Sequence, residues 1–298
     1  MVSEINLTPT ASLLDIPRGS TESDDQLFIP ARSWGTAGDC IAGALLVHGL
    51  GAHSGWFEAL GRRLKVKRIL ALAYDQVGFG KRRSQEFKSE KQWFEDLTTS
   101  YNHLKQLVGD RPVYVMGNSM GAAVALKVVA DEMISPAGLV MFSPGFDGHP
   151  RTFNLSYRLS AIVRALLSPE EEIAVPYTPE MVTRTESVRT WMLKDPDRRF
   201  SPTGRMLLSV LKLSLALKHV KSVSCPVYMF RAGIDTIVDS KKAQLIFSRL
   251  QSPSKREHTF EQAWHDLMFD PVIDELVNDI AAWVAETSRA PGEKLQTN

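Results

Sequence analysis

Short apolar runs alternate along this chain with longer segments of helical spacing, and this alternation limits the possible folds more than any other feature. The runs have the length of strands that are buried on both faces of a sheet. They lie at residues 41–47, 68–74, 113–116, 138–142 and 227–232. Helical patterns separate the first four runs, as in βαβ units, whose strands are parallel. The sequence therefore predicts the α/β class with a mostly parallel sheet.

The alternation stops between residues 146 and 205. Within this stretch, residues 153–167 have helical spacing, and loops that contain proline surround them. We expect a helical cap at residues 146–205, inserted into an α/β core made of residues 26–145 and 206–288. The predicted organisation is completed by a flexible arm at residues 1–25 and a frayed tail at residues 289–298.

The composition is that of a soluble globular protein. Hydrophobic residues make up 44% of the 298 residues and charged residues 23%, and the formal net charge is +1. A chain so close to neutral gives no reason to expect a nucleic acid or an anionic membrane as a partner. The richest apolar segment, residues 206–217, is interrupted by Lys212 and is too short to span a bilayer, so no stable membrane span is predicted.

The cysteines and the N-terminus bear on location. The first 20 residues lack the cationic start and long apolar stretch of a secretory signal. Cys40 and Cys225 each lie beside or inside an apolar run, which predicts two reduced, buried thiols rather than a disulfide framework. We therefore expect a cytoplasmic protein, either a monomer or a homodimer.

The sequence Gly-Asn-Ser-Met-Gly at residues 117–121 lies between a predicted strand and a predicted helix. In that position the G-x-S-x-G pattern is typical of a nucleophile turn, in which the serine backbone is strained and small neighbours avoid a collision. The turn exposes the hydroxyl of Ser119 at the start of a helix, where free N–H groups favour a developing anion. The alternative is a glycine-rich turn in which Ser119 has no chemical role.

A serine nucleophile needs a base, and in this kind of site the order along the chain is serine, carboxylate, histidine. Of the seven histidines, His265 is the one that follows the last predicted strand in a loop. Asp235, at the end of the preceding predicted strand, is the favoured partner that would orient the imidazole. Asp239 and Asp147 are its rivals, whereas Asp266 is disfavoured because residues adjacent in sequence point in different directions.

Two backbone N–H groups are needed to bind the oxyanion that forms during acyl transfer. Met120, directly after the proposed nucleophile, supplies the first candidate. Leu50 supplies the second, in the glycine-rich turn at residues 48–51, which could also be purely structural. Asp75, followed by two glycines in residues 78–80, indicates a further structural turn beside the site.

These motifs occur in one order along the chain: residues 48–51, Asp75 with residues 78–80, residues 117–121, Asp235, and Trp264 with His265. Over roughly residues 25–288 the sequence resembles the monoacylglycerol lipase / lysophospholipase branch of the α/β-hydrolases, of the serine aminopeptidase S33 type. The resemblance implies an α/β-hydrolase fold with an eight-stranded, mostly parallel sheet and a helical cap. It also implies hydrolysis of acyl esters by Ser119, Asp235 and His265, with Leu50 and Met120 as oxyanion donors. The sequence departs from the branch at Asn118, where histidine is usual, and at Ala122, where glycine is common.

The cap is where the choice of substrate is expected to be made. An apolar stripe there would lie along an acyl chain, and it comprises Phe153, Leu159, Ile162 and Leu166, together with Leu155 and Leu167. The same stripe could instead pack the cap onto the sheet. The predicted substrate is a small-molecule acyl ester such as a monoacylglycerol or a lysophospholipid-like molecule.

Two other functions use the same residues differently. A thioesterase or an acyltransferase would take the acyl group from a thioester or pass it to an acceptor other than water. A non-catalytic binding protein would keep the fold, but such proteins usually lose a member of the triad. Metal-ligand spacing such as H-E-x-x-H, a phosphate loop and a dinucleotide fingerprint do not occur in the sequence, so no metal or cofactor is predicted.

Overall fold

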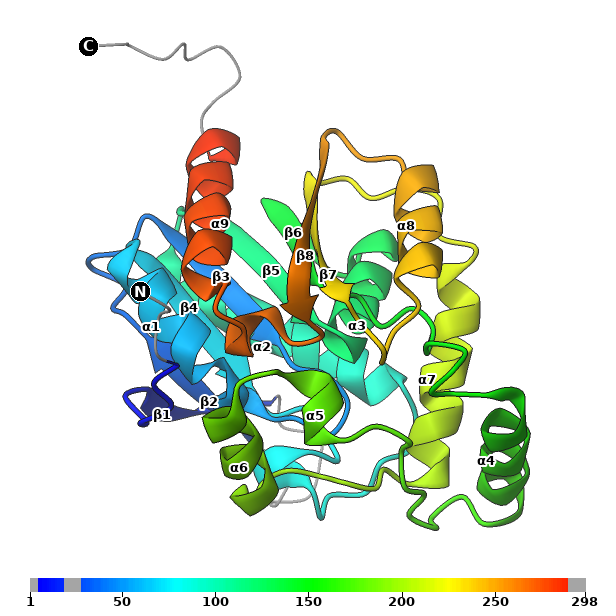
Figure 1. Ribbon diagram of the computed structural model, residues 1–298. Helices are drawn as coiled ribbons and strands as arrows, with labels where there is room; N and C mark the ends of the chain where they lie inside the picture. Colours follow the sequence, from blue (N-terminus) through cyan, green and yellow to red (C-terminus); the bar gives the residue numbers. More distant parts are fainter. Residues whose placement is uncertain (1–4, 19–27, 289–298) are drawn as a thin grey trace.

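One eight-stranded sheet forms the centre of the protein in the computed structural model, which describes residues 5–18 and 28–288 (Figure 1). The strand order is β1-β2-β4-β3-β5-β6-β7-β8. The strands are β1 Ser12–Pro17, β2 Phe28–Trp34, β3 Ala42–Val47, β4 Ile69–Tyr74, β5 Val113–Asn118, β6 Gly138–Phe142, β7 Val227–Ile234 and β8 Lys255–Trp264. β1 and β2 pair antiparallel, as do β2 and β4, and the other neighbours are parallel. The predicted α/β-hydrolase architecture, with its mostly parallel sheet, is confirmed.

Helices cover both faces of this sheet, and each face has its own hydrophobic core. The flanking helices are α1 Glu58–Val66, α2 Lys91–Val108, α3 Met120–Ala130, α7 Gly204–Leu217, α8 Ser240–Arg249 and α9 Ile273–Thr287. Side chains of α2, α3, α7 and α8 share one core, while α1 and α9 contribute to the other. Two layers of helices bury the apolar strands from both sides, which explains why those strands are hydrophobic without alternation.

The N-terminal arm predicted at residues 1–25 is wrong for residues 12–17. These residues form β1, whose backbone pairs with β2 along its whole length. Ile16 is fully buried while Leu13 is 76% exposed, so one face of an edge strand packs on the core. A short edge strand with one buried apolar residue produces little sequence signal, which is why it was missed. Residues 1–4 and 19–25 of the predicted arm and the predicted tail at residues 289–298 lie outside the described residues.

The segment between β6 and α7 leaves the sheet and forms the cap. It contains α4 Leu155–Leu167, α5 Pro179–Val182 and α6 Glu186–Lys194. In Figure 1 this segment lies beyond the arrowhead of β8, at the carboxyl edge of the parallel strands. α4 packs against α7 at close range, because a Cβ on Gly204 would lie 2.7 Å from the Cα of Ala165. The cap therefore covers the edge of the sheet where the predicted site residues lie.

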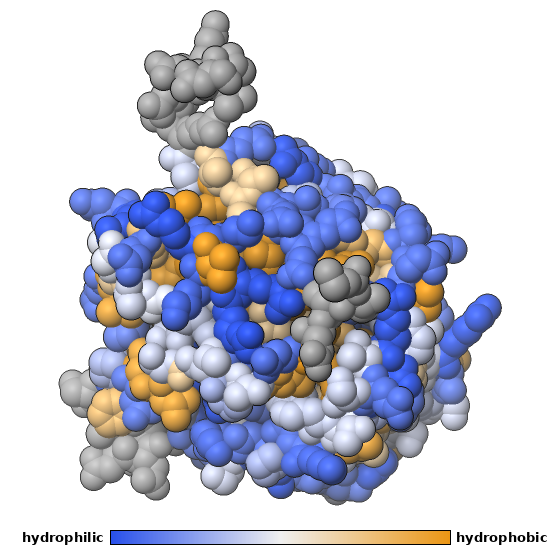
Figure 2. Space-filling view, turned by 60° about the vertical axis from the view of Figure 1, so that its left-hand side comes forward, coloured by the Kyte–Doolittle hydropathy of each residue, from blue (hydrophilic) through white to orange (hydrophobic). Residues whose placement is uncertain are grey.

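The surface is mixed in character. On the face that Figure 2 shows, hydrophobic side chains lie in small groups between hydrophilic ones. Within the described part of the chain, no helix combines the length and the hydrophobicity that crossing a membrane requires.

Candidate active site

Ser119 lies in the sharp turn between β5 and α3. Its backbone has φ 52° and ψ −119°, a strained conformation that costs about 1–3 kcal/mol. A Cβ on Gly117 would lie 2.5 Å from the Cα of Ala122, and a Cβ on Gly121 would lie 2.1 Å from the carbonyl oxygen of Val47. Both glycines are therefore required by close backbone approach, and together they allow the turn that presents Ser119.

Hydrogen bonds from three directions hold the Ser119 backbone. Its N–H donates to the carbonyl of Phe142 at 3.0 Å, and its own carbonyl accepts from Gly145 at 2.9 Å and from Ala122 at 3.1 Å. Strain at one residue persists where the surroundings fix it in this way. The side chain is thus placed at the start of α3 by β6, by the loop that follows β6 and by the first turn of α3.

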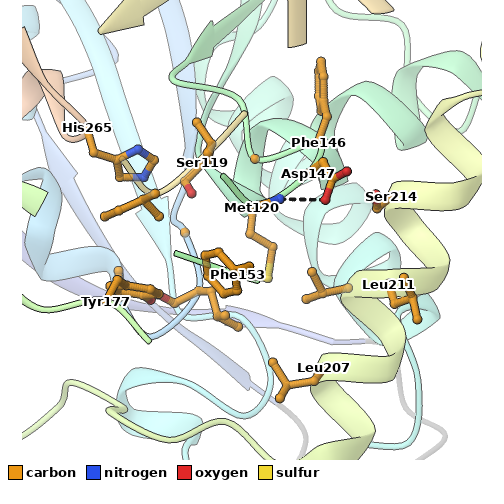
Figure 3. Close-up of a pocket in the computed structure, with 18 of the residues that line it drawn as sticks. Ser119, Met120, Phe146, Asp147, Phe153, Tyr177, Leu207, Leu211, Ser214 and His265 are labelled. Atoms are coloured by element: carbon orange, nitrogen blue, oxygen red, sulfur yellow. Dashed lines mark hydrogen bonds between the residues drawn. The ribbon is translucent and has the colours of Figure 1, made fainter. Parts of the chain in front are cut away.

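His265 and Asp235 form a buried hydrogen-bonded pair. The Nδ1 atom of His265 lies 2.8 Å from Oδ2 of Asp235, and the other carboxylate oxygen accepts from the N–H groups of Ile237 and Val238. Burial would lower the pKa of His265, but the negative charge and hydrogen bond of Asp235, together with the charge of Asp266, raise it above its usual value. Figure 3 shows the hydroxyl of Ser119 pointing toward the ring of His265.

An irregularity between β7 and β8 brings these two residues together. β8 extends to Trp264, and its pairing with β7 shifts between Ala232 and Ile234. A Cβ on Gly233 would lie 2.3 Å from the carbonyl oxygen of Glu261, so a glycine is needed where the strands approach. The shift leaves Asp235 and His265 at neighbouring strand ends.

The rival carboxylates are engaged elsewhere. Asp239 accepts from the N–H of Lys242 as the N-cap of α8, and Asp147 pairs with Arg158 at 2.8 Å and with Lys242. Asp266 accepts a hydrogen bond from the Nδ2 atom of Asn118, and burial raises its pKa. The pairing of Asn118 with Asp266 was not predicted, because nothing in the sequence relates residues 148 positions apart.

Other histidines have separate partners. The Nδ1 atom of His258 lies 2.6 Å from Oδ2 of Asp279, and the Nε2 atom of His53 lies 2.8 Å from Oδ2 of Asp195. His48 accepts from the N–H of Gln76 at 3.1 Å, and burial lowers its pKa to about 4. None of these contacts involves Ser119, whereas His265 lines the same cavity as Ser119, where a base for this serine must lie.

The turn that carries Leu50 lies directly against Ser119, since a Cβ on Gly49 would be 3.1 Å from the Cβ of Ser119. The cap holds this turn. Tyr177 donates its hydroxyl hydrogen to the carbonyl of Leu50 at 3.0 Å, and the N–H of Arg199 donates to the carbonyl of Gly51 at 2.9 Å. The structure thus brings Leu50, Met120 and Ser119 to one cavity wall.

A second contact joins the cap to the same region of the core. Asp195, which follows α6, accepts from the indole N–H of Trp56 at 2.8 Å and bonds to His53. These contacts bring a carboxylate of the cap to the helical turn η2 Ser54–Phe57 that follows the Leu50 turn. The position of the cap and that of the Leu50 turn are therefore linked. Sequence reasoning missed this link, because its members are about 140 residues apart.

A cavity of about 220 Å³ lies between the sheet edge and the cap. Ser119, Met120 and His265 line one part of it, and apolar side chains of α4 and α7 line another. Figure 3 shows Leu207 and Leu211 of α7 on the opposite side from His265 and Tyr177. An apolar compartment thus continues from the serine toward α7.

Two of the four predicted substrate-binding residues need correction. Phe153 and Ile162 line the cavity, but Leu159 and Leu166 do not, and they are 56% and 65% exposed. α4 buries its small residues Ala161 and Ala165, which let it approach α7 closely, and its leucines lie on the exposed face. The prediction places the largest apolar side chains of the helix on its inner face, whereas close packing against α7 requires the smallest side chains there.

The comparisons with known proteins agree with this geometry. A parallel sheet with a strained serine between β5 and α3, an aspartate after β7 and a histidine after β8 defines an α/β-hydrolase-fold protein. Residues 41–272 match the model of the family described as serine aminopeptidase, S33, and the chain belongs to this family. Membership confirms the branch predicted from the sequence.

Individual relatives extend over nearly the whole chain. Human monoglyceride lipase is 25% identical over 286 residues, which cover 93% of this chain and 93% of the human protein. A soluble variant of monoglyceride lipase from Saccharomyces cerevisiae, solved with a substrate analog, superposes with a TM-score of 0.81 at 20% identity and covers 97% of this chain and 99% of that one. Monoacylglycerol lipase from Paleococcus ferrophilus has a TM-score of 0.75 at 22% identity and covers 87% and 99%.

Proposed function

We propose that this protein is a serine hydrolase that cleaves carboxylic acyl esters, such as monoacylglycerols or lysophospholipid-like substrates, through an acyl-enzyme on Ser119. The observation that carries the proposal is that Ser119 and His265 line one cavity, while Asp235 holds the imidazole of His265 from behind. The monoglyceride lipases among the relatives support the ester class.

In the proposed mechanism His265 accepts the hydroxyl proton of Ser119 as the serine oxygen attacks the ester carbonyl. Because Asp235 occupies Nδ1, the Nε2 atom is the one available to take this proton. The N–H groups of Leu50 and Met120 bind the oxyanion. His265 then returns the proton to the leaving alcohol, and water cleaves the acyl-enzyme by the same sequence of steps.

The acyl chain is proposed to lie in the apolar compartment between α4 and α7. Ile162, Leu207 and Leu211 line it, and Phe153 lies between it and the serine. Burial of a chain there is favoured by about 0.8 kcal/mol for each CH₂ group. The alcohol half of the ester then lies on the opposite side of Ser119.

The experiment is a hydrolysis profile across p-nitrophenyl esters and monoacylglycerols for the wild-type protein and Ser119→Ala. Ser119→Ala should fold normally and lose turnover on the order of a thousandfold or more. Ser248→Ala is the matched control, because Ser248 is exposed on α8 and should leave turnover unchanged. Turnover that survives in Ser119→Ala would disprove the proposed nucleophile, and acyl transfer to an added acceptor in place of water would favour an acyltransferase.

Location and assembly also belong to this proposal. We propose a cytoplasmic protein, which the two free, buried cysteines support, since burial raises the pKa of Cys225 to about 12 and leaves its thiol inert. A monomer or a homodimer is proposed as the assembly.

A further inference from the structure

Arg198 of the cap is a buried cation whose side chain has no direct polar partner in residues 5–18 and 28–288. The residue is 5% exposed, and among the described residues no hydrogen bond or ion pair reaches its guanidinium, whose Nη1 atom is buried and unsatisfied. The ring of Phe200 lies 4.1 Å from its Cζ atom and that of Trp56 lies 5.9 Å away. Aromatic faces stabilise the charge but accept no conventional hydrogen bond, so the donors stay free.

The carboxylates around Arg198 are committed to other groups. Asp195 bonds to His53 and Trp56, and Asp266 bonds to Asn118. Glu180, the third carboxylate whose charge acts on Arg198, is exposed and bonds to Thr178. The charges of these three carboxylates act on Arg198 from a distance and partly offset the lowering of its pKa by burial. The contrast with Arg158 is clear, because Arg158 also lines the cavity but has Asp147 at 2.8 Å. Of these two cavity arginines, Arg198 is the one left without a partner in the described part of the chain.

The free guanidinium belongs to the alcohol side of the cavity. Arg198 lines the same cavity as Ser119, and its aromatic neighbour Trp56 belongs to η2, beside the Leu50 turn. The apolar compartment lies in the other direction, because Figure 3 shows Leu207 and Leu211 opposite Tyr177, whose hydroxyl bonds to the Leu50 turn. A substrate whose chain fills that compartment would present its alcohol half to Arg198.

We propose that Arg198 binds an anionic group, a phosphate or a carboxylate, carried on the alcohol half of the ester. This inference rests on the proposed function and selects, among acyl esters, those with a charged alcohol. A guanidinium offers paired N–H donors that match phosphate and carboxylate oxygens. A buried charge is stable when it is paired, and a neutral alcohol would leave the Arg198 charge without a counter-ion at bonding distance.

The test compares two esters that share one acyl chain, 1-decanoylglycerol and 1-decanoylglycerol 3-phosphate, each below its micelle concentration. An acyl ester of glycolic acid with the same chain forms the carboxylate arm. The proteins are the wild type, Arg198→Met, Arg198→Lys and the control Arg205→Met, whose exposed side chain pairs with Glu170 on the cap. A p-nitrophenyl ester measures the chemistry without a charged alcohol.

The wild-type protein should hydrolyse the phosphate or carboxylate ester with a higher kcat/KM than the neutral one. Arg198→Met should lower kcat/KM for the charged ester by about tenfold or more while changing the p-nitrophenyl ester by less than about threefold. Arg198→Lys should recover part of the loss, and Arg205→Met should change none of these rates. The two charged arms then tell phosphate from carboxylate.

Equal losses on charged and neutral esters would overturn the proposal and assign Arg198 a structural role between its aromatic neighbours. So would a wild-type preference for the neutral ester. If Arg198→Met fails to fold, competitive inhibition of the wild-type protein decides: glycerol 3-phosphate or glycolate must inhibit more strongly than glycerol. Failure of the proposed function is distinct, because Ser119 would then be inert toward every ester, including the p-nitrophenyl ester.

Discussion

At the scale of single residues, the proposed role of His265 as the base makes activity depend on its charge state. The imidazole must be neutral to accept the serine proton. Asp235 and Asp266 both stabilise its protonated form, which raises the pKa of His265. Activity should therefore be lost as the pH falls through a value above the ordinary pKa of about 6.5 for histidine.

Asp266 gives this dependence a specific test. In Asp266→Asn one negative charge near His265 is removed, so the imidazolium is less stable and the pKa of His265 falls. The acid limb of kcat/KM should move to lower pH, by up to about one unit. The pH profile with a p-nitrophenyl ester measures this, and Asp131→Asn, on the exposed end of α3, serves as the control. An acid limb that stays in place or moves to higher pH would contradict this role of Asp266.

At the scale of elements, the cap does more than cover the cavity. Tyr177 and Arg199 hold the turn that carries Leu50, and Asp195 holds the helical turn that follows it. The proposed oxyanion donor is the N–H of Leu50. The next two carbonyls along the chain, those of Leu50 and Gly51, accept hydrogen bonds from the cap. A donor is effective when its orientation is fixed before the charge develops. Contacts made by the cap should therefore influence kcat.

Tyr177→Phe removes one of these hydrogen bonds. A net loss of about 0.5–1.5 kcal/mol in positioning corresponds to a decrease of kcat of about two- to tenfold. Tyr101→Phe is the matched control, because its hydroxyl also donates to a backbone carbonyl, that of Ser135, far from the site. Steady-state kinetics with a p-nitrophenyl ester separate kcat from KM. A change confined to KM, or an equal effect in both variants, would argue against the positioning role.

Elements with strong local patterns could be predicted from the sequence, and those fixed by packing could not. The apolar run of β5, the small residues around Ser119 and the helix after it each constrain the backbone locally, and the turn follows from them. The face that α4 turns inward depends instead on how closely it can approach α7, which Ala165 and Gly204 determine.

The candidate site divides in the same way. The chain order of serine, aspartate and histidine predicts Ser119, Asp235 and His265, because the ends of parallel strands meet at one edge. The partner of Asn118 and the isolation of Arg198 depend on residues brought together by the cap. No periodicity in the sequence encodes such long-range side-chain contacts.

At the scale of the whole molecule, we expect the stability contributed by the sheet edge at β1 to be separable from the geometry of the active site. β1 is at one edge of the sheet, and three strands lie between it and β5. Ile16 of β1 nevertheless contributes to the same core as α2 and α3. Damage to this edge should lower stability without altering the geometry around Ser119.

Ile16→Ala tests this separation. It should lower the free energy of unfolding by about 2–4 kcal/mol, because a fully buried side chain leaves a cavity. Leu13→Ala, on the exposed face of the same strand, should change it by less than about 0.5 kcal/mol. Urea denaturation measures both values, and kcat/KM below the transition should equal that of the wild type. Equal stabilities of the two variants would mean that β1 does not pack on the core.

The nucleophile and its base can be tested together by labelling with a fluorophosphonate at neutral pH, followed by peptide mass spectrometry. One adduct on Ser119 is expected, formed at least about a hundredfold more slowly in His265→Ala and in Asp235→Asn. Asp279→Asn, which alters the separate His258–Asp279 pair, should label at the wild-type rate. Absence of the adduct, an adduct on another serine, or labelling that does not depend on His265 would contradict catalysis by Ser119, His265 and Asp235.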